Sequence, residues 1–110
     1  MSEYIQVVTT SSSPEEARKI ADALVQRRLA ACVQIIGPIT SVFRWQEKID
    51  TAEEWLCLAK TRGDLFADVE AAIRAKHTYQ VPEILAVPIS AGHAAYLAWL
   101  GNELAERRQS

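Results

Sequence analysis

The chain has 110 residues, of which 49% are hydrophobic and 24% are charged, and its formal net charge is −2. This length and composition predict one globular domain spanning residues 1–110, with a core that needs no metal ion or disulfide to hold it. The small negative charge argues against partners such as nucleic acid or an anionic membrane surface. No apolar run approaches the roughly 20 residues that cross a bilayer.

The cysteines and the first residues predict the compartment. Cys32 and Cys57 are the only two cysteines, and each lies within an apolar run. That pattern is typical of buried thiols in a reducing compartment rather than of a disulfide framework. The first four residues show neither the charged nor the apolar region of a signal peptide. We therefore expect a cytoplasmic protein.

The first elements along the chain are a strand and a helix. Residues 4–10 are rich in β-formers and predict the strand. Ser13 is expected to cap the helix, with Pro14 at its first position and Glu16 completing a capping box. The apolar residues of the helix recur at the spacing that faces a core. They are Ala17, Ile20, Ala21 and Leu24.

A long hairpin is predicted next. Residues 32–36 favour a strand that a bulge or bend at Gly37-Pro38 interrupts, because proline cannot donate to a ladder. Residues 39–45 and 48–61 favour two long strands with a tight turn near Gln46-Glu47. Strands of about 14 residues reach roughly 45 Å, whereas a compact domain of this size has a radius of gyration of about 13 Å. The hairpin should therefore extend beyond the body of the domain.

The remaining elements complete the predicted fold. A second helix is expected to begin at Gly63-Asp64, a last strand to span residues 84–89, and a final helix to follow Gly92. The order β-α-β-β-α-β plus a terminal helix predicts an α+β protein with the ferredoxin-like split βαβ arrangement and helices on one face of the sheet. The apolar face of the second helix is expected to hold Leu65, Val69, Ala72 and Ile73.

The other face of this sheet should not be left to solvent. A strand with one wet face alternates polar and apolar residues, but residues 33–36 and 55–59 place apolar groups on both faces. Long exposed strand edges also favour pairing with another chain. We therefore expect a tight homo-oligomer held by sheet faces and hairpin edges.

The best candidate site lies between the second helix and the last strand. His77, one of two histidines, is expected at the end of the helix, and Pro82 sets the backbone of the turn that carries Glu83. A polar cluster held on such a turn is where a site is expected. The imidazole is suited either to bind a metal ion or to hydrogen-bond a terminal carbonyl of the helix. The residues alone leave both roles open.

Other functions of this fold find little support in the residues. An acylphosphatase-like hydrolase needs an asparagine that orients water, but Asn102, in the final helix, is the only one. Recognition of RNA needs stacking aromatic residues and a basic surface, and residues 56–59 offer no such pair. No nucleophile and base can be paired from spacing, so we expect no enzyme and no organic cofactor. Residues 9–14 leave open an anion site at a helix start, as in a small-ligand or signalling module.

Several segments carry a family resemblance. The chain resembles the CutA-type divalent-cation-tolerance family in segments that sample nearly its whole length in the right order. The resemblance implies a cytoplasmic homotrimer of ferredoxin-like subunits, PII-like in shape and linked to tolerance of copper and other divalent ions. The matching segments are residues 29–33, 43–49, 60–62, 77–84, 88–89 and 96–99.

The resemblance also implies a metal site. Cys32, His77 and Glu83 occupy positions where metal contact has been proposed for the family, which predicts a low-specificity site for Cu(II) or another divalent cation. One imidazole and one carboxylate hold Cu(II) only loosely, although copper binds at the tight end of the divalent series. Ligands from the same or a neighbouring subunit are both compatible with a trimer. The alternative is a structural or signalling trimer that binds a protein partner or a small anionic metabolite, with incidental metal binding.

The chain departs from the family pattern at a few positions. Thr78 and Gln80 replace a proline and a glutamate, and the lost carboxylate removes one oxygen ligand from the expected site. The hairpin turn has Glu47 where glycine is common. His93 stands where asparagine often precedes the last helix, as a cap or as an added ligand.

Overall fold

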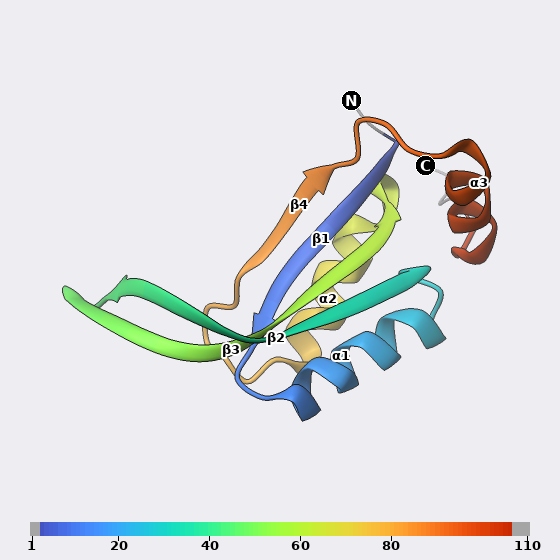
Figure 1. Cartoon of the computed structure of the whole chain (residues 1–110). Coiled ribbons are helices and arrows are strands. Elements are labelled where there is room, and N and C mark those ends of the chain that lie inside the picture. The colour runs from blue at the N-terminus through green and yellow to red at the C-terminus, as the bar shows by residue number, and fades with distance from the viewer. Residues whose placement is uncertain (1–2, 107–110) are drawn as a thin grey trace.

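The structure is a computed structural model that describes residues 3–106 of the chain. Its four strands form one antiparallel sheet in the order β2-β3-β1-β4, which confirms the predicted ferredoxin-like fold with an extra C-terminal helix (Figure 1). Within the described residues, no helix is long and apolar enough to cross a membrane. The elements are β1 (Tyr4–Ser11), α1 (Pro14–Gln26), β2 (Cys32–Trp45), β3 (Lys48–Arg62), the short 3-10 helix η1 (Gly63–Leu65), α2 (Phe66–Lys76), β4 (Ile84–Pro88) and α3 (Ala94–Glu103).

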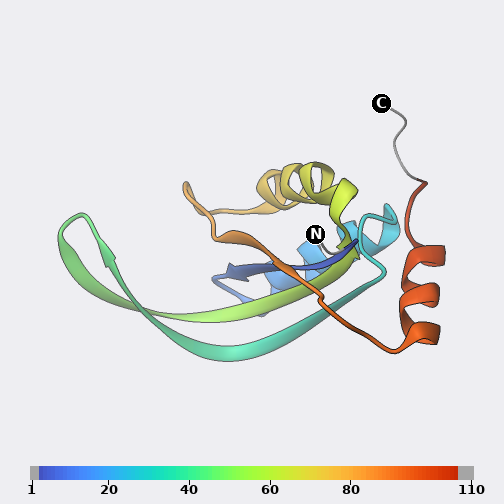
Figure 2. The same ribbon diagram turned by 90° about the horizontal axis from the view of Figure 1, so that it is seen from above.

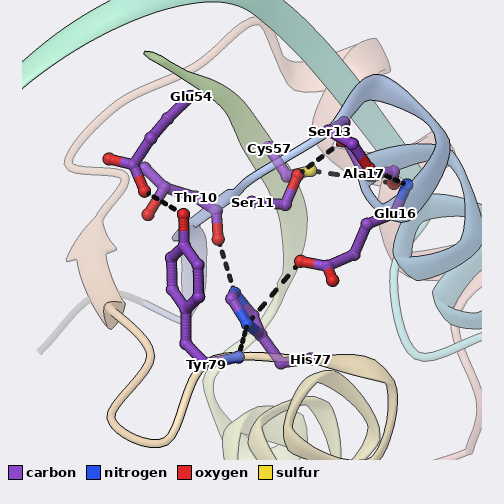
Figure 3. Close-up of polar contacts among 9 residues, drawn as sticks. All are labelled: Thr10, Ser11, Ser13, Glu16, Ala17, Glu54, Cys57, His77 and Tyr79. Atoms are coloured by element: carbon purple, nitrogen blue, oxygen red, sulfur yellow. Dashed lines mark hydrogen bonds and ion pairs between the residues drawn. The ribbon is translucent and has the colours of Figure 1, made fainter. Parts of the chain in front are cut away.

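The start of α1 follows the prediction only in part. Pro14 occupies the first turn, and the hydroxyl oxygen of Ser13 accepts the backbone N–H of Glu16 at 3.1 Å. In a capping box the glutamate side chain would reach back to the cap. Here the carboxylate of Glu16 points instead into the protein, toward His77 (Figure 3). The sequence pattern therefore located the helix start correctly but assigned this carboxylate to the wrong partner.

The core lies between one face of the sheet and the helices α1 and α2. The apolar faces predicted for both helices are buried, as expected from their spacing. They meet Ile5 and Val7 of β1 and Ala59 of β3, whose side chains share one face of the sheet because the strands alternate. From the helices come Ile20, Leu24, Leu65, Val69, Ala72 and Ile73.

The hairpin formed by β2 and β3 extends beyond the rest of the sheet. Pairing between β1 and β3 ends at Ser11 and Trp55, and the seven residues of β3 before Trp55 pair with β2 alone. This part projects from the body in both views (Figures 1 and 2) and lengthens the molecule to 43 Å along one axis, against 26 Å along the others. The predicted overhang is confirmed.

The expected irregularity at Gly37-Pro38 is a bulge inside one continuous strand. The register of β2 against β3 shifts between Ile36 and Ile39, and the strand continues on both sides. The indole of Trp55 lies over the bulge, so that a Cβ atom on Gly37 would stand 2.2 Å from a ring carbon. Only glycine fits under that ring, which ties the bulge to this position.

The sheet face opposite α1 and α2 carries apolar side chains that no described element covers. The register places Leu58, Val8 and Leu85 in one row across three strands. Leu85 is 56% exposed, and Val87 and Ile36 on the same face are 48% and 49% exposed. Exposed apolar groups gathered in this way mark an interaction surface.

Helix α3 docks at the end of the sheet through apolar and polar contacts. Leu100 and Leu104 are buried in the common core. Arg28, which follows α1 with a φ of 58°, donates to the backbone carbonyls of Asn102 and Glu103 at 2.8 and 2.9 Å. One arginine thus satisfies carbonyls that the end of a helix leaves without intrahelical partners.

The turn of the hairpin should be stabilised by Glu47→Gly. Gln46 and Glu47 have φ values of 51° and 66°, a conformation that strains a residue with a Cβ atom but not glycine. We expect Glu47→Gly to raise the free energy of unfolding in urea by about 0.5–1 kcal/mol. Glu47→Ala is the matched control, because it removes the carboxylate and keeps the Cβ atom. An equal gain from both substitutions would mean that charge, not backbone strain, limits the turn.

Candidate functional site

His77 lies directly after α2 and is held by hydrogen bonds at both ring nitrogens (Figure 3). Its Nε2 atom lies 2.5 Å from the carbonyl oxygen of Thr10, and its Nδ1 atom accepts the backbone N–H of Tyr79 at 3.1 Å. A carbonyl can only accept, so the proton is on Nε2. The side chain of His77 is 0% exposed. The imidazole therefore joins the end of β1 to the end of α2 and to the loop that follows.

This arrangement limits what His77 can bind. Neutral imidazole binds a metal ion through the nitrogen that carries the free lone pair. In His77 that nitrogen is Nδ1, and its lone pair already accepts from Tyr79. A metal ion at Nδ1 would have to displace this hydrogen bond inside a buried pocket.

The buried carboxylate of Glu16 lies beside the imidazole. Oε1 of Glu16 stands 3.7 Å from Nδ1 of His77, and this oxygen is buried without a hydrogen-bond partner among the described residues.

The thiol of Cys57 lies near the same carboxylate. Burial, with the nearby charge of Glu16 as a smaller cause, raises the pKa of Cys57 to about 11. The thiol of Cys57 points at the carbonyl oxygen of Ala17, 3.8 Å away. Cys57 is thus a buried, protonated thiol, as its apolar neighbours in the sequence indicated.

Tyr79 ties the loop after α2 to the base of the hairpin. Its hydroxyl donates to Oε2 of Glu54 at 2.8 Å, and its ring lies 4.7 Å from that of His77, centroid to centroid. Burial first, then the bond to Glu54, raise the pKa of Tyr79 to about 12. Glu54 is only 7% exposed, and sequence reasoning missed it. No motif marks Glu54, because its partner is 25 residues away in the chain.

The other predicted ligands lie elsewhere. Cys32 is half-buried at the start of β2, opposite Lys60. The pKa of Tyr96 is raised mainly by burial and to a smaller extent by the neighbouring Cys32. Glu83 is exposed on the loop before β4. Among residues 3–106, no three His, Cys, Asp or Glu side chains are grouped so that they could hold a metal ion. Within the single chain, the described residues therefore do not bring Cys32, His77 and Glu83 together as a metal site. His93 precedes α3, but its side chain does not cap the helix.

A groove opens where the overhanging hairpin faces the loop after α2. Its volume is about 480 Å³, and aromatic and aliphatic side chains make up most of its wall. Two carboxylates and one amide supply its polar part. The lining residues are Phe43, Trp45 and Asp50 of the hairpin and Tyr79, Gln80, Val81 and Glu83 of the loop.

The fold and the buried imidazole define a ferredoxin-like protein with a polar cluster under one helix end. Comparison with known proteins identifies the family within this class. The model of the CutA1 divalent ion tolerance protein family matches residues 5–103, and the chain belongs to that family.

Individual relatives agree with this assignment. The chain is 47% identical over 94 residues to the divalent-cation tolerance protein CutA of Thermus thermophilus, a match that covers 86% of this chain and 91% of that protein. It is 41% identical over 98 residues to the chloroplastic protein CutA of Arabidopsis thaliana, covering 89% of this chain and 54% of that longer protein. The crystal structure of CutA1 from Oryza sativa superposes with a TM-score of 0.92 at 37% identity, over 96% of both chains.

The hydrogen bond from the Tyr79 hydroxyl to Glu54 should stabilise the protein to an extent that depends on pH. At neutral pH we expect Tyr79→Phe to lower the free energy of unfolding by about 1–2 kcal/mol, because the buried Glu54 carboxylate loses its donor. The pKa of Tyr79 is raised from 10 to about 12. Its contribution is therefore complete below pH 10 and is lost as the pH rises toward 12.

Urea denaturation at neutral and alkaline pH measures both effects. The difference between wild type and Tyr79→Phe should shrink above pH 10. Glu54→Gln and the double variant complete a mutant cycle that isolates the pair. A difference that stays constant through this range would show that the hydroxyl does not carry the effect.

Proposed function

We propose that this protein acts in the response to divalent cations as a cytoplasmic homotrimer, and that it catalyses no reaction. Membership of the divalent ion tolerance family supports the first part. Two isolated cysteines in apolar runs, typical of thiols in a reducing compartment, support the location, although the name of the Arabidopsis thaliana relative places that protein in the chloroplast.

Association with further copies of the chain is supported by the uncovered sheet face. The row of Leu58, Val8 and Leu85 lies on that face, and the overhanging hairpin has strand edges that pair with no other element among residues 3–106. Burying such surfaces is a common source of stability in closed homo-oligomers. The choice of three subunits rests on the family resemblance.

For the metal, we propose low-specificity binding of Cu(II) at exposed ligands rather than at the buried imidazole. One observation carries this proposal: both nitrogens of His77 are hydrogen-bonded inside the protein. The bond from Tyr79 to His77 holds the loop that presents Glu83. Glu83, and Cys32 to a lesser extent, would then contact the ion, with ligands from neighbouring subunits completing its coordination.

The alternative is a structural or signalling trimer in which metal binding is incidental. The observation that favours it is the lack of any group of three potential metal ligands among residues 3–106. Copper binds measurably even to poor sites because it lies at the tight end of the divalent series. Affinity alone therefore does not separate the two functions, and the effect of single substitutions does.

Equilibrium dialysis of reduced protein against Cu(II), with a competing chelator, tests the metal proposal. We expect Glu83→Gln to weaken binding by about tenfold, since a charged oxygen ligand is lost, and Cys32→Ser to weaken it less. His77→Ala should act on the loop, seen as faster hydrogen exchange at Tyr79. Glu53→Gln removes an exposed carboxylate of β3 as the matched control. Equal, weak binding in all variants would favour the alternative.

Light scattering at micromolar concentration tests the assembly. Leu85 is 56% exposed on the uncovered sheet face, and Val25 is 44% exposed on α1. We expect Leu85→Glu to dissociate the trimer, because it places a charge in the buried interface, whereas Val25→Glu should leave it intact. A wild-type monomer at this concentration would refute the proposal that the sheet face is an interface.

A further inference from the structure

The groove between the hairpin and the loop after α2 is built from rigid parts. Its volume of about 480 Å³ lies in the range of small-molecule sites. On the loop side, Tyr79 is fixed by bonds to Glu54 and to His77. On the hairpin side, Phe43 and Asp50 are direct cross-strand partners. The two walls thus meet in a defined geometry.

The charge of the groove selects the sign of a ligand. Asp50 and Glu83 both line it, and among the described lining residues none is basic. Lys48 pairs with Trp45 across the hairpin but is not part of the lining. Two carboxylates in a largely apolar wall disfavour an anion and attract a cation.

The aromatic side chains select the kind of cation. Phe43, Trp45 and Tyr79 line the same groove, and the faces of such rings attract organic cations. A hard divalent ion prefers about six oxygen ligands, whereas most of this wall is apolar and only two carboxylates of the described residues line it. Asp50 is oriented by its own backbone, since Oδ1 accepts the N–H of Thr51 at 2.8 Å. Its other oxygen would accept a hydrogen bond from the ligand.

We propose that this groove binds a small organic cation with a guanidinium or alkylammonium head. The head would donate hydrogen bonds to Asp50 and Glu83 while it stacks on the aromatic rings. A guanidinium suits both contacts, because its edge donates to carboxylates in a fork and its face stacks on rings. The aliphatic part of the ligand would lie against Val81. The proposal shares Glu83 with the proposed metal function but does not require that function.

Binding of agmatine, which carries a guanidinium and an amine on a four-carbon chain, tests the proposal. Calorimetry uses the assembled wild-type protein at matched ionic strength, with EDTA present so that copper plays no part. Butylurea is the uncharged analogue of similar shape. We expect agmatine to bind with a Kd of about 1 mM or lower, and butylurea to bind about tenfold more weakly or not at all.

Variants of the groove assign the contacts. Asp50→Asn combined with Glu83→Gln should weaken agmatine binding by about tenfold or more, and Trp45→Leu by about threefold or more. Glu53→Gln should have no effect, since this carboxylate does not line the groove. Light scattering confirms that each variant keeps the wild-type assembly.

Three outcomes would overturn the proposal. Butylurea binding as tightly as agmatine would show that charge does not select the ligand. An equal loss in Glu53→Gln would show that agmatine responds only to the overall negative charge. No binding at about 10 mM agmatine would mean that the groove is closed in the assembled protein, as it would be if another copy of the chain filled it.

Discussion

The fully buried imidazole of His77 is the interaction on which this end of the molecule depends. β1 pairs with β4 only as far as Thr9, and the carbonyl of Thr10, one residue further on, receives Nε2–H of His77 instead. The same ring accepts the N–H of Tyr79. A single side chain thereby closes the gap between the end of a strand and the end of a helix, and it sets where the next loop begins.

The consequences of that contact reach the hairpin. Because Tyr79 is held by His77, its hydroxyl meets the carboxylate of Glu54, in the part of β3 that lies beyond its pairing with β1. The loop and the hairpin are then tied together, and the groove opens between them. Buried polar networks of this kind stabilise one arrangement when their members are satisfied. The groove is thus a product of the imidazole as much as of the hairpin.

The sequence predicted the features that neighbouring residues determine, but not the contacts between residues far apart in the chain. The start of α1 and the bulge at Gly37 follow from neighbouring residues, and both were predictable. The role of His77 was left open, because its partner Thr10 is 67 residues away in the chain. Glu16 was assigned to a capping box, since that pattern uses the same residue. Its carboxylate instead lies beside His77, a residue far along the chain that the capping pattern does not include.

The position of Glu16 in turn explains why the imidazole keeps its present partners. Oε1 of Glu16 and Nδ1 of neutral His77 are both acceptors, and at 3.7 Å they do not form a hydrogen bond. Tyr79 therefore has the lone pair of Nδ1 to itself. A cation placed at Nδ1 would gain the nearby carboxylate but would lose the bond that positions the loop and, with it, the contact of Tyr79 to Glu54. The hydrogen bonds of the neutral ring are thus the ones that hold the loop after α2 in place, which is the physical reason for proposing that Cu(II) binds at exposed ligands such as Glu83 instead.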